Sequence, residues 1–93
     1  MLISICIPTF NRRGQLAEAF QSVVGQAFSD CEIIISDDAS SDGTAEYLAT
    51  INHPQILVNR NATNLGLIRN HNLCIRLAKG EWTLFLHDDD LLR

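Results

Sequence analysis

Four short apolar segments, separated by stretches with helical spacing, constrain the fold of this sequence more than any other feature. The segments are rich in β-branched residues and typical of buried strands; they cover residues 2–7, 31–36, 55–59 and 81–87. Between them, apolar residues recur at three- and four-residue steps, which is typical of amphipathic helices. Helices are expected around Leu16, Phe20 and Val23, over residues 42–51, and around Leu67, His71 and Cys74. The alternation predicts an α/β fold with a mainly parallel sheet and helices on its faces.

Size and composition narrow the class of protein. The chain has 93 residues, of which 46% are hydrophobic and 19% charged, as in a single soluble globular domain. The net charge of −4 argues against nucleic acid as the main partner. No apolar run approaches the roughly 18 residues of a membrane helix, and no leader is recognised, so a cytoplasmic protein is expected. Three cysteines without a CxxC pair predict buried, reduced thiols: Cys6, Cys31 and Cys74.

Polar clusters follow three of the expected strands. They are PTFNR at 8–12, SDDASSDGT at 36–44 and HDDD at 87–90. Within the first, Pro8 should end its strand and Asn11 should cap the helix that follows. Open α/β sheets bind ligands outside the carboxyl ends of their strands. If the first and fourth strands are neighbours, all three clusters border one crevice.

These clusters, together with NLG at 64–66, RN at 69–70 and AKGEW at 78–82, appear in one order over nearly the whole chain. The sequence resembles the donor-binding half of the family 2 glycosyltransferases. The resemblance implies a GT-A (Rossmann-like), three-layer α/β/α fold. Residues 1–93 would form its N-terminal, donor-binding part, truncated after the fourth strand. The acceptor-binding half and the general base would lie beyond Arg93.

The resemblance also implies a nucleotide site. Its expected members are Pro8, Thr9, Phe10, Asp37, Asp38, Arg69 and Asp88. Phe10 would offer its ring to the base, with core packing as the alternative. Asp37 and Asp38 would accept from the uracil ring N–H, since a carboxylate is only an acceptor; turn formation is the alternative. Arg69 would point to the nucleotide or lie on a solvated helix face. Arg12, Arg13 and Arg60 would flank a diphosphate or be ordinary surface charges.

A divalent cation, Mn²⁺ or Mg²⁺, is the implied cofactor. Such ions prefer carboxylates and phosphate oxygens, and they neutralise the charge that develops on the leaving diphosphate. Asp89 is the expected metal ligand, with Asp88 directed to the metal or the ribose. His87 stands where many relatives have the first aspartate of the DxD motif, and Asp90 is expected to be a bystander. The alternative for the whole triplet is a solvated acidic loop.

The implied activity is metal-dependent, inverting transfer of a sugar from a nucleotide donor, commonly UDP-linked, to a glycan, lipid or protein acceptor. The alternative is a non-catalytic nucleotide-binding or assembly module that completes a site with a partner. Receiver domains and haloacid-dehalogenase phosphatases carry their aspartates directly after strand one, where this sequence has PTFNR. A dinucleotide-binding domain needs GxGxxG at that turn. Uncovered apolar surface predicts self-association, and the longer protein could lie peripherally at the inner face of the membrane.

Overall fold

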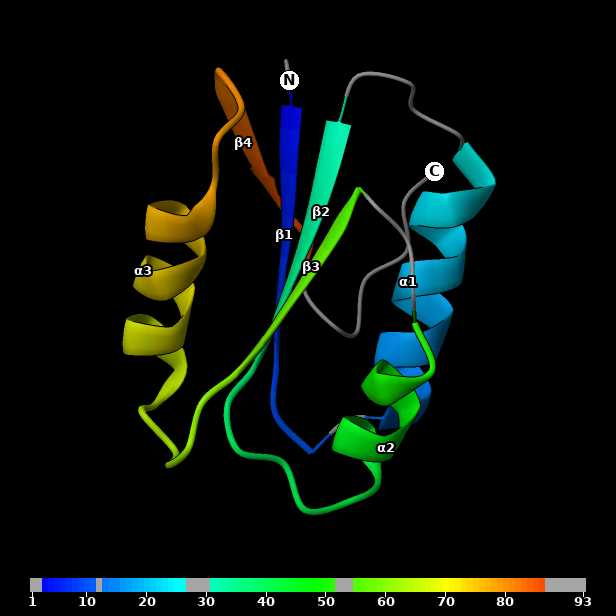
Figure 1. Ribbon diagram of the computed structural model, residues 1–93, viewed down its shortest axis with the longest axis vertical. Helices are drawn as coiled ribbons and strands as arrows, with labels where there is room; N and C mark the ends of the chain where they lie inside the picture. Colours follow the sequence, from blue (N-terminus) through cyan, green and yellow to red (C-terminus); the bar gives the residue numbers. More distant parts are fainter. Residues whose placement is uncertain (1–2, 12, 27–30, 52–54, 87–93) are drawn as a thin grey trace.

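A computed structural model describes residues 3–11, 13–26, 31–51 and 55–86 of the chain. The predicted alternation of strands and helices is confirmed (Figure 1). In chain order the elements are β1 (Ile3–Thr9), α1 (Arg13–Gln26), β2 (Cys31–Asp37), α2 (Thr44–Ala49), β3 (Ile56–Arg60), α3 (Leu67–Leu77) and β4 (Trp82–Phe85). Each apolar segment of the sequence therefore forms a strand, and each helically spaced stretch forms a helix.

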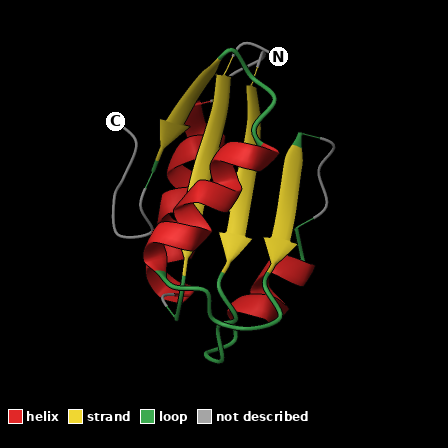
Figure 2. Cartoon of the chain, turned by 90° about the vertical axis from the view of Figure 1, so that its left-hand side faces the viewer, coloured by secondary structure: helices red, strands yellow, loops and turns green. Residues whose placement is uncertain are grey.

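The four strands form one parallel sheet in the order β3-β2-β1-β4. The first and fourth strands are therefore neighbours, which was the condition for the three polar clusters to border one crevice. Helices α1 and α2 lie on one face of the sheet and α3 lies on the other (Figure 1). Figure 2 shows α3 lying across the strands. The expected three-layer α/β/α arrangement of the GT-A fold is confirmed.

The first strand is longer than expected, because it continues through Pro8 to Thr9. The carbonyl of Thr9 accepts the N–H of Asp38, on the β2 side, at 2.9 Å. Neighbouring residues of a strand point their backbone groups to opposite sides, so Pro8 faces the β4 side. The pairing of β1 with β4 ends at Cys6 and Phe85, before Pro8 is reached. Proline is tolerated at this position because no ladder hydrogen bond is required there.

Alternating residues of the sheet contribute to two separate cores. On the α1 and α2 side, strand residues such as Ile5 and Ile35 pack with Leu16 and Leu48. On the α3 side a smaller core contains the fully buried residues Cys6, Ile34 and Cys74. This division explains why the strands are apolar on both faces.

The three cysteines are buried and reduced, as expected. Cys6 donates to the carbonyl of Cys74 at 3.7 Å. A side-chain hydrogen bond with Cys74, together with burial, raises the pKa of the Cys6 thiol. A protonated, buried thiol is a poor nucleophile, so Cys6 contributes to packing and not to chemistry. None of the helices in the described part of the chain is long and apolar enough to cross a bilayer.

Candidate functional site

The carboxyl ends of the strands place predicted site residues side by side. Thr9 pairs with Asp37 across β1 and β2, and Asp37 pairs with Arg60 across β2 and β3. These three residues end neighbouring parallel strands at one level of the sheet. Phe10 follows directly and is 44% exposed. The first two polar clusters of the sequence therefore meet at one edge, which we call the carboxyl edge.

Asp37 is fully buried at this edge and organises the loop that follows β2. Its Oδ1 accepts hydrogen bonds from the backbone N–H and the hydroxyl of Ser40. The Nε of Arg60 lies 3.3 Å from Oδ2, which accepts no hydrogen bond from the described residues. Arg60 also donates to the carbonyl of Ser40 at 3.0 Å. Arg60 thus supports Asp37 and its loop, a role that its position in the sequence did not reveal.

Asp38 is buried as well, but its carboxylate faces a different loop. Its Oδ1 accepts from the backbone N–H of Leu65 at 2.7 Å and from the side-chain amide of Asn61 at 2.9 Å. Its Oδ2 accepts from the N–H of Gly66 at 2.9 Å. Asp38 therefore holds the turn that leads into α3. Its proposed contact with the nucleobase stays a prediction.

The loops after β1 and β2 brace each other through reciprocal hydrogen bonds. The N–H of Asn11 donates to the hydroxyl of Ser40, and the N–H of Ser41 donates to the side-chain oxygen of Asn11, both at 2.8 Å. Asn11 and Ala39 have positive φ angles of 50° and 65°. Left-handed backbone is uncommon for residues other than glycine and often marks functional loops. The geometry of the carboxyl edge is thus fixed by contacts between two loops.

Asp42 joins the starts of two helices, so the expectation that Asn11 caps α1 needs correction. Asp42 Oδ2 accepts from the N–H of Arg13, the first residue of α1, at 3.0 Å. Its Oδ1 accepts from the N–H of Thr44, the first residue of α2, and from the Thr44 hydroxyl. The bond from that hydroxyl lowers the pKa of Asp42. Asn11 instead bonds to the neighbouring loop, where the tertiary contact takes precedence over local capping.

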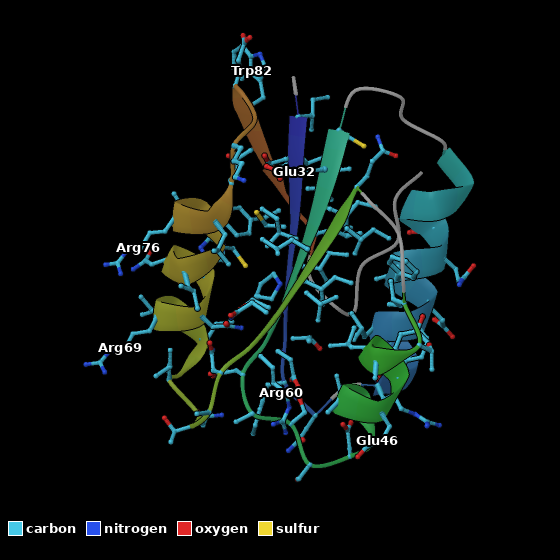
Figure 3. The ribbon with its side chains drawn as sticks, viewed as in Figure 1. Glu32, Glu46, Arg60, Arg69, Arg76 and Trp82 are labelled. Atoms are coloured by element: carbon cyan, nitrogen blue, oxygen red, sulfur yellow. The ribbon has the colours of Figure 1, made fainter. Side chains whose placement is uncertain are left out.

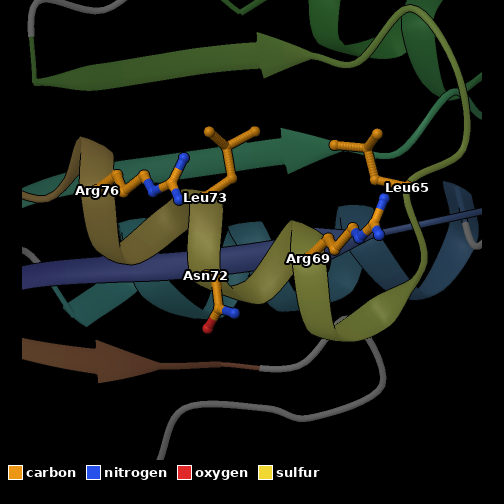
Figure 4. A pocket seen from close by; sticks show the side chains of 5 residues that line it. All are labelled: Leu65, Arg69, Asn72, Leu73 and Arg76. Carbon is orange, nitrogen blue, oxygen red and sulfur yellow. The ribbon is translucent and has the colours of Figure 1, made fainter.

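Arg69 lies near the start of α3 with its side chain directed away from the sheet (Figure 3). It lines a groove on the outer face of the helix, together with Leu65, Asn72, Leu73 and Arg76 (Figure 4). The structure does not bring Arg69 into contact with Asp37 or Asp38. Its role in nucleotide binding therefore stays a prediction.

Buried asparagines below α3 were not singled out as structural residues by the sequence. The side-chain oxygen of Asn70 accepts from the Ser36 hydroxyl at 2.7 Å and from the amide of Asn61 at 3.1 Å. The amide of Asn70 donates to the carbonyl of Ser36 at 2.9 Å. The RN motif thus contributes a buried link between α3 and the sheet. The only sequence signal for this network was the frequency of Asn in residues 59–72.

The expected metal ligands Asp88 and Asp89, with His87 and Asp90, lie outside the described residues. The strand that precedes them, β4, lies beside β1 and ends at Phe85. Within residues 3–11, 13–26, 31–51 and 55–86, no group of three His, Cys, Asp or Glu side chains could hold a metal ion. The described residues thus include the expected nucleotide-binding residues other than Asp88, whose role stays a prediction, and the expected metal ligands are known from the sequence alone.

A parallel sheet with helices on both faces, and with polar loops gathered at its carboxyl edge, defines an α/β protein of the ligand-binding type. The sequence profile described as glycosyl transferase family 2 matches residues 4–93. The chain therefore belongs to that family, which confirms the resemblance inferred from its motifs.

Two curated relatives and one solved structure illustrate the similarity. Abequosyltransferase RfbV of Salmonella typhimurium is 44% identical, over 99% of this chain and 29% of the relative. A Campylobacter jejuni protein named GalNAc(5)-diNAcBac-PP-undecaprenol beta-1,3-glucosyltransferase is 38% identical, over 97% of this chain and 30% of that protein. The crystal structure of Staphylococcus aureus TarS 1–349 in complex with UDP-GlcNAc matches with a TM-score of 0.88 and 29% identity, over 98% of this chain and 27% of that TarS fragment. The chain thus spans less than a third of the length of these proteins.

Proposed function

We propose that this chain forms the donor-binding part of a metal-dependent, inverting glycosyltransferase whose donor is a UDP-sugar. One observation carries the proposal: Thr9, Asp37 and Arg60 end three neighbouring strands at one level, next to the exposed ring of Phe10. UDP-GlcNAc is bound by TarS, which shares this fold at 29% identity. Membership of glycosyl transferase family 2 supports sugar transfer as the reaction class.

The described residues would bind and orient the nucleotide. Phe10 can stack on the base, because its ring is partly exposed beside Thr9 at the end of β1. Pro8 and Thr9 would line the base edge, with the Thr9 carbonyl itself already accepting the N–H of Asp38. Asp37 is fully buried under Arg60, so a direct bond from the uracil N–H to Oδ2 requires the half-exposed Arg60 side chain to turn aside. The Arg69 side chain, which is directed away from the sheet (Figure 3), would have to rotate toward the carboxyl edge to reach the nucleotide.

The divalent cation, Mn²⁺ or Mg²⁺, would be held by Asp89 and Asp88, which follow the last described residue, Leu86, by three and two positions. Carboxylates suit such hard cations. The cation would supply neutralising charge to the leaving diphosphate. We place the acceptor site, for a glycan, lipid or protein, and the general base outside residues 1–93. The proposed location is the cytoplasm, and a longer protein would lie peripherally at the inner face of the membrane.

Calorimetric titration with UDP, with and without Mn²⁺, tests the proposal directly. UDP binding is expected to require the cation and to be lost in Asp89→Ala. Asp90→Ala is the matched control, because it removes a neighbouring carboxylate that has no assigned contact. Phe10→Ala should weaken binding roughly tenfold, since stacking on one base contributes about 1–3 kcal/mol. Equal losses in the two aspartate variants, or no UDP binding by the unaltered chain, would contradict the proposed site.

We also propose self-association through β4, one of the two edge strands of the described sheet. Trp82 is 69% exposed and Leu84 is 46% exposed on this strand. Uncovered edge strands that carry apolar side chains tend to pair with another chain. Sedimentation equilibrium should show dimers that Trp82→Lys converts to monomers. A monomer for the unaltered chain at high concentration would count against this proposal.

A further inference from the structure

Charge is distributed unevenly over this acidic chain. Although its net charge is −4, residues 55–80 contain no Asp or Glu and four of the seven basic residues: Arg60, Arg69, Arg76 and Lys79. Three of these four belong to α3 or the turn that follows it. Exposed acidic residues such as Glu18 and Glu46 lie on α1 and α2, on the other side of the sheet, and Glu81 is exposed just before β4. The α3 side of the molecule is therefore locally basic.

The outer face of α3 is also unusually apolar for an exposed surface. Ile68 is 76% exposed and Ile75 is 50% exposed. The inner face of the same helix is already occupied by the buried residues Asn70 and Cys74. The exposed apolar residues therefore have no packing role in the described structure. Large apolar side chains gathered on one exposed face mark an interaction surface.

Cationic and apolar groups are interleaved on this face. Arg69 and Arg76 are separated by two helical turns, and their side chains flank Leu73 along a groove of about 270 Å³ (Figure 4). Leu65 and Asn72 complete the groove. Guanidinium groups bind phosphate oxygens through paired N–H donors. A groove of this kind can receive a phosphate group while the neighbouring isoleucines contact hydrocarbon.

We propose that the outer face of α3, defined by Leu65, Ile68, Arg69, Ile75, Arg76 and Lys79, docks on an anionic phospholipid bilayer. Basic residues on an interfacial helix attract anionic headgroups, and apolar residues beside them enter the boundary between headgroups and acyl chains. Charge complementarity selects this occupant: the face is basic on a chain that is acidic overall. The exposed isoleucines favour a lipid surface over nucleic acid, whose phosphates offer no apolar counterpart. The inference deepens the proposed location at the inner face of a membrane and shares only Arg69 with the proposed donor site.

Co-sedimentation with vesicles tests the docking. Phosphatidylcholine vesicles with phosphatidylglycerol should bind the unaltered chain, and vesicles of phosphatidylcholine alone should not. The double variant Arg76→Gln/Lys79→Gln should lower the partition coefficient roughly 25-fold, at roughly fivefold for each charge. Ile68→Ser/Ile75→Ser should lower it roughly tenfold or more. Arg13→Gln is the matched control, because it removes one exposed cation from the other side of the sheet and should leave binding unchanged.

The variants leave Arg69 and the carboxyl edge intact, so UDP titration of the same proteins separates this inference from the proposed function. Circular dichroism should report an unchanged fold, since each altered side chain is exposed. Equal binding to both kinds of vesicle would overturn the proposal by pointing to unspecific adhesion. Binding that survives the α3 substitutions would overturn it by placing the contact elsewhere. A dimer that Ile68→Ser/Ile75→Ser dissociates would assign the face to a second copy of the chain.

Discussion

Asp38 is a predicted ligand-binding residue whose carboxylate also stabilises the fold. Its carboxylate accepts two backbone N–H groups, from Leu65 and Gly66, and one amide from Asn61. The side chain is only 2% exposed. Buried donors that lose their acceptor retain the full cost of desolvation. The turn before α3 should therefore depend on this carboxylate together with Asn64, whose side-chain oxygen accepts from Gly66 N–H at 3.1 Å.

Asp38→Ala is expected to lower the free energy of unfolding by about 1–3 kcal/mol, because it leaves the part-buried N–H of Leu65 without an acceptor and removes one of two acceptors from Gly66 and Asn61. Chemical denaturation without any nucleotide measures this change. The matched control is Asp42→Ala, the same truncation at an exposed residue whose hydrogen bonds go to helix starts, with an expected cost of about 1 kcal/mol. If Asp38→Ala is as stable as the unaltered protein, the carboxylate acts only as a ligand contact.

The sequence predicts Asp37 and Asp38 as candidate site residues, but it could not tell their structural partners apart. Both follow the same strand, yet Asp37 bonds within its own loop and Asp38 bonds to residues some 27 positions away. Arg60 could not be separated from surface charge, since only the register of β2 and β3 places it beside Asp37. Contacts between distant loops depend on tertiary geometry, which local pattern does not encode.

At the scale of elements, the connection between α3 and β4 is constrained by Gly80. A Cβ at this position would lie 2.7 Å from the backbone nitrogen of Ser4 and 2.8 Å from the carbonyl carbon of Ile3. The N–H of Gly80 donates to the Ser4 hydroxyl at 2.7 Å, and that hydroxyl donates to Glu32 at 2.6 Å. The start of β4 is therefore held directly against β1 by a residue without a side chain.

Gly80→Ala should lower the free energy of unfolding by about 1–3 kcal/mol, because backbone atoms of β1 cannot yield to the added methyl group. Thermal denaturation followed by circular dichroism measures the change. Gly14→Ala is the opposite control: its added Cβ meets nothing within 4 Å in the exposed first turn of α1. There alanine should stabilise the helix by about 0.5–1 kcal/mol. Equal effects of the two substitutions would contradict the close approach at Gly80.

The elements themselves were predictable because their signals are local. Apolar runs of four to seven residues formed strands, and three- to four-residue spacing formed helices. The extension of β1 through Pro8 was not predictable, since it depends on where the pairing with β4 stops. The buried hydrogen bonds of Asn70 were equally unpredictable, because an Asn in a helix is ordinarily expected to be exposed to solvent. Its 2% exposure follows from the Ser36 group that happens to lie beneath it.

At the scale of the whole molecule, one sheet separates two cores of unequal size. Leu16 is fully buried in the larger core, against strand residues such as Ile5 and Ile35. On the opposite face, His71 stacks on Phe85 with ring centroids 3.6 Å apart. The strands supply alternate residues to both cores, so neither core can persist after the sheet separates. The molecule should therefore unfold as one cooperative unit despite its two layers of helices.

Leu16→Ala tests this cooperativity, because it removes packing on the α1 face of the sheet while stability is measured in α3, on the opposite face. The substitution should lower the free energy of unfolding by about 2–4 kcal/mol. Amide hydrogen exchange should show the same loss of protection in α3 as in α1, since global unfolding exposes both. Gln15→Ala, exposed on the same helix, should change stability by no more than about 0.5 kcal/mol. Protection of α3 that is unaffected by Leu16→Ala would mean that each face unfolds alone, and α3 could then rearrange on a bilayer without disturbing the carboxyl edge.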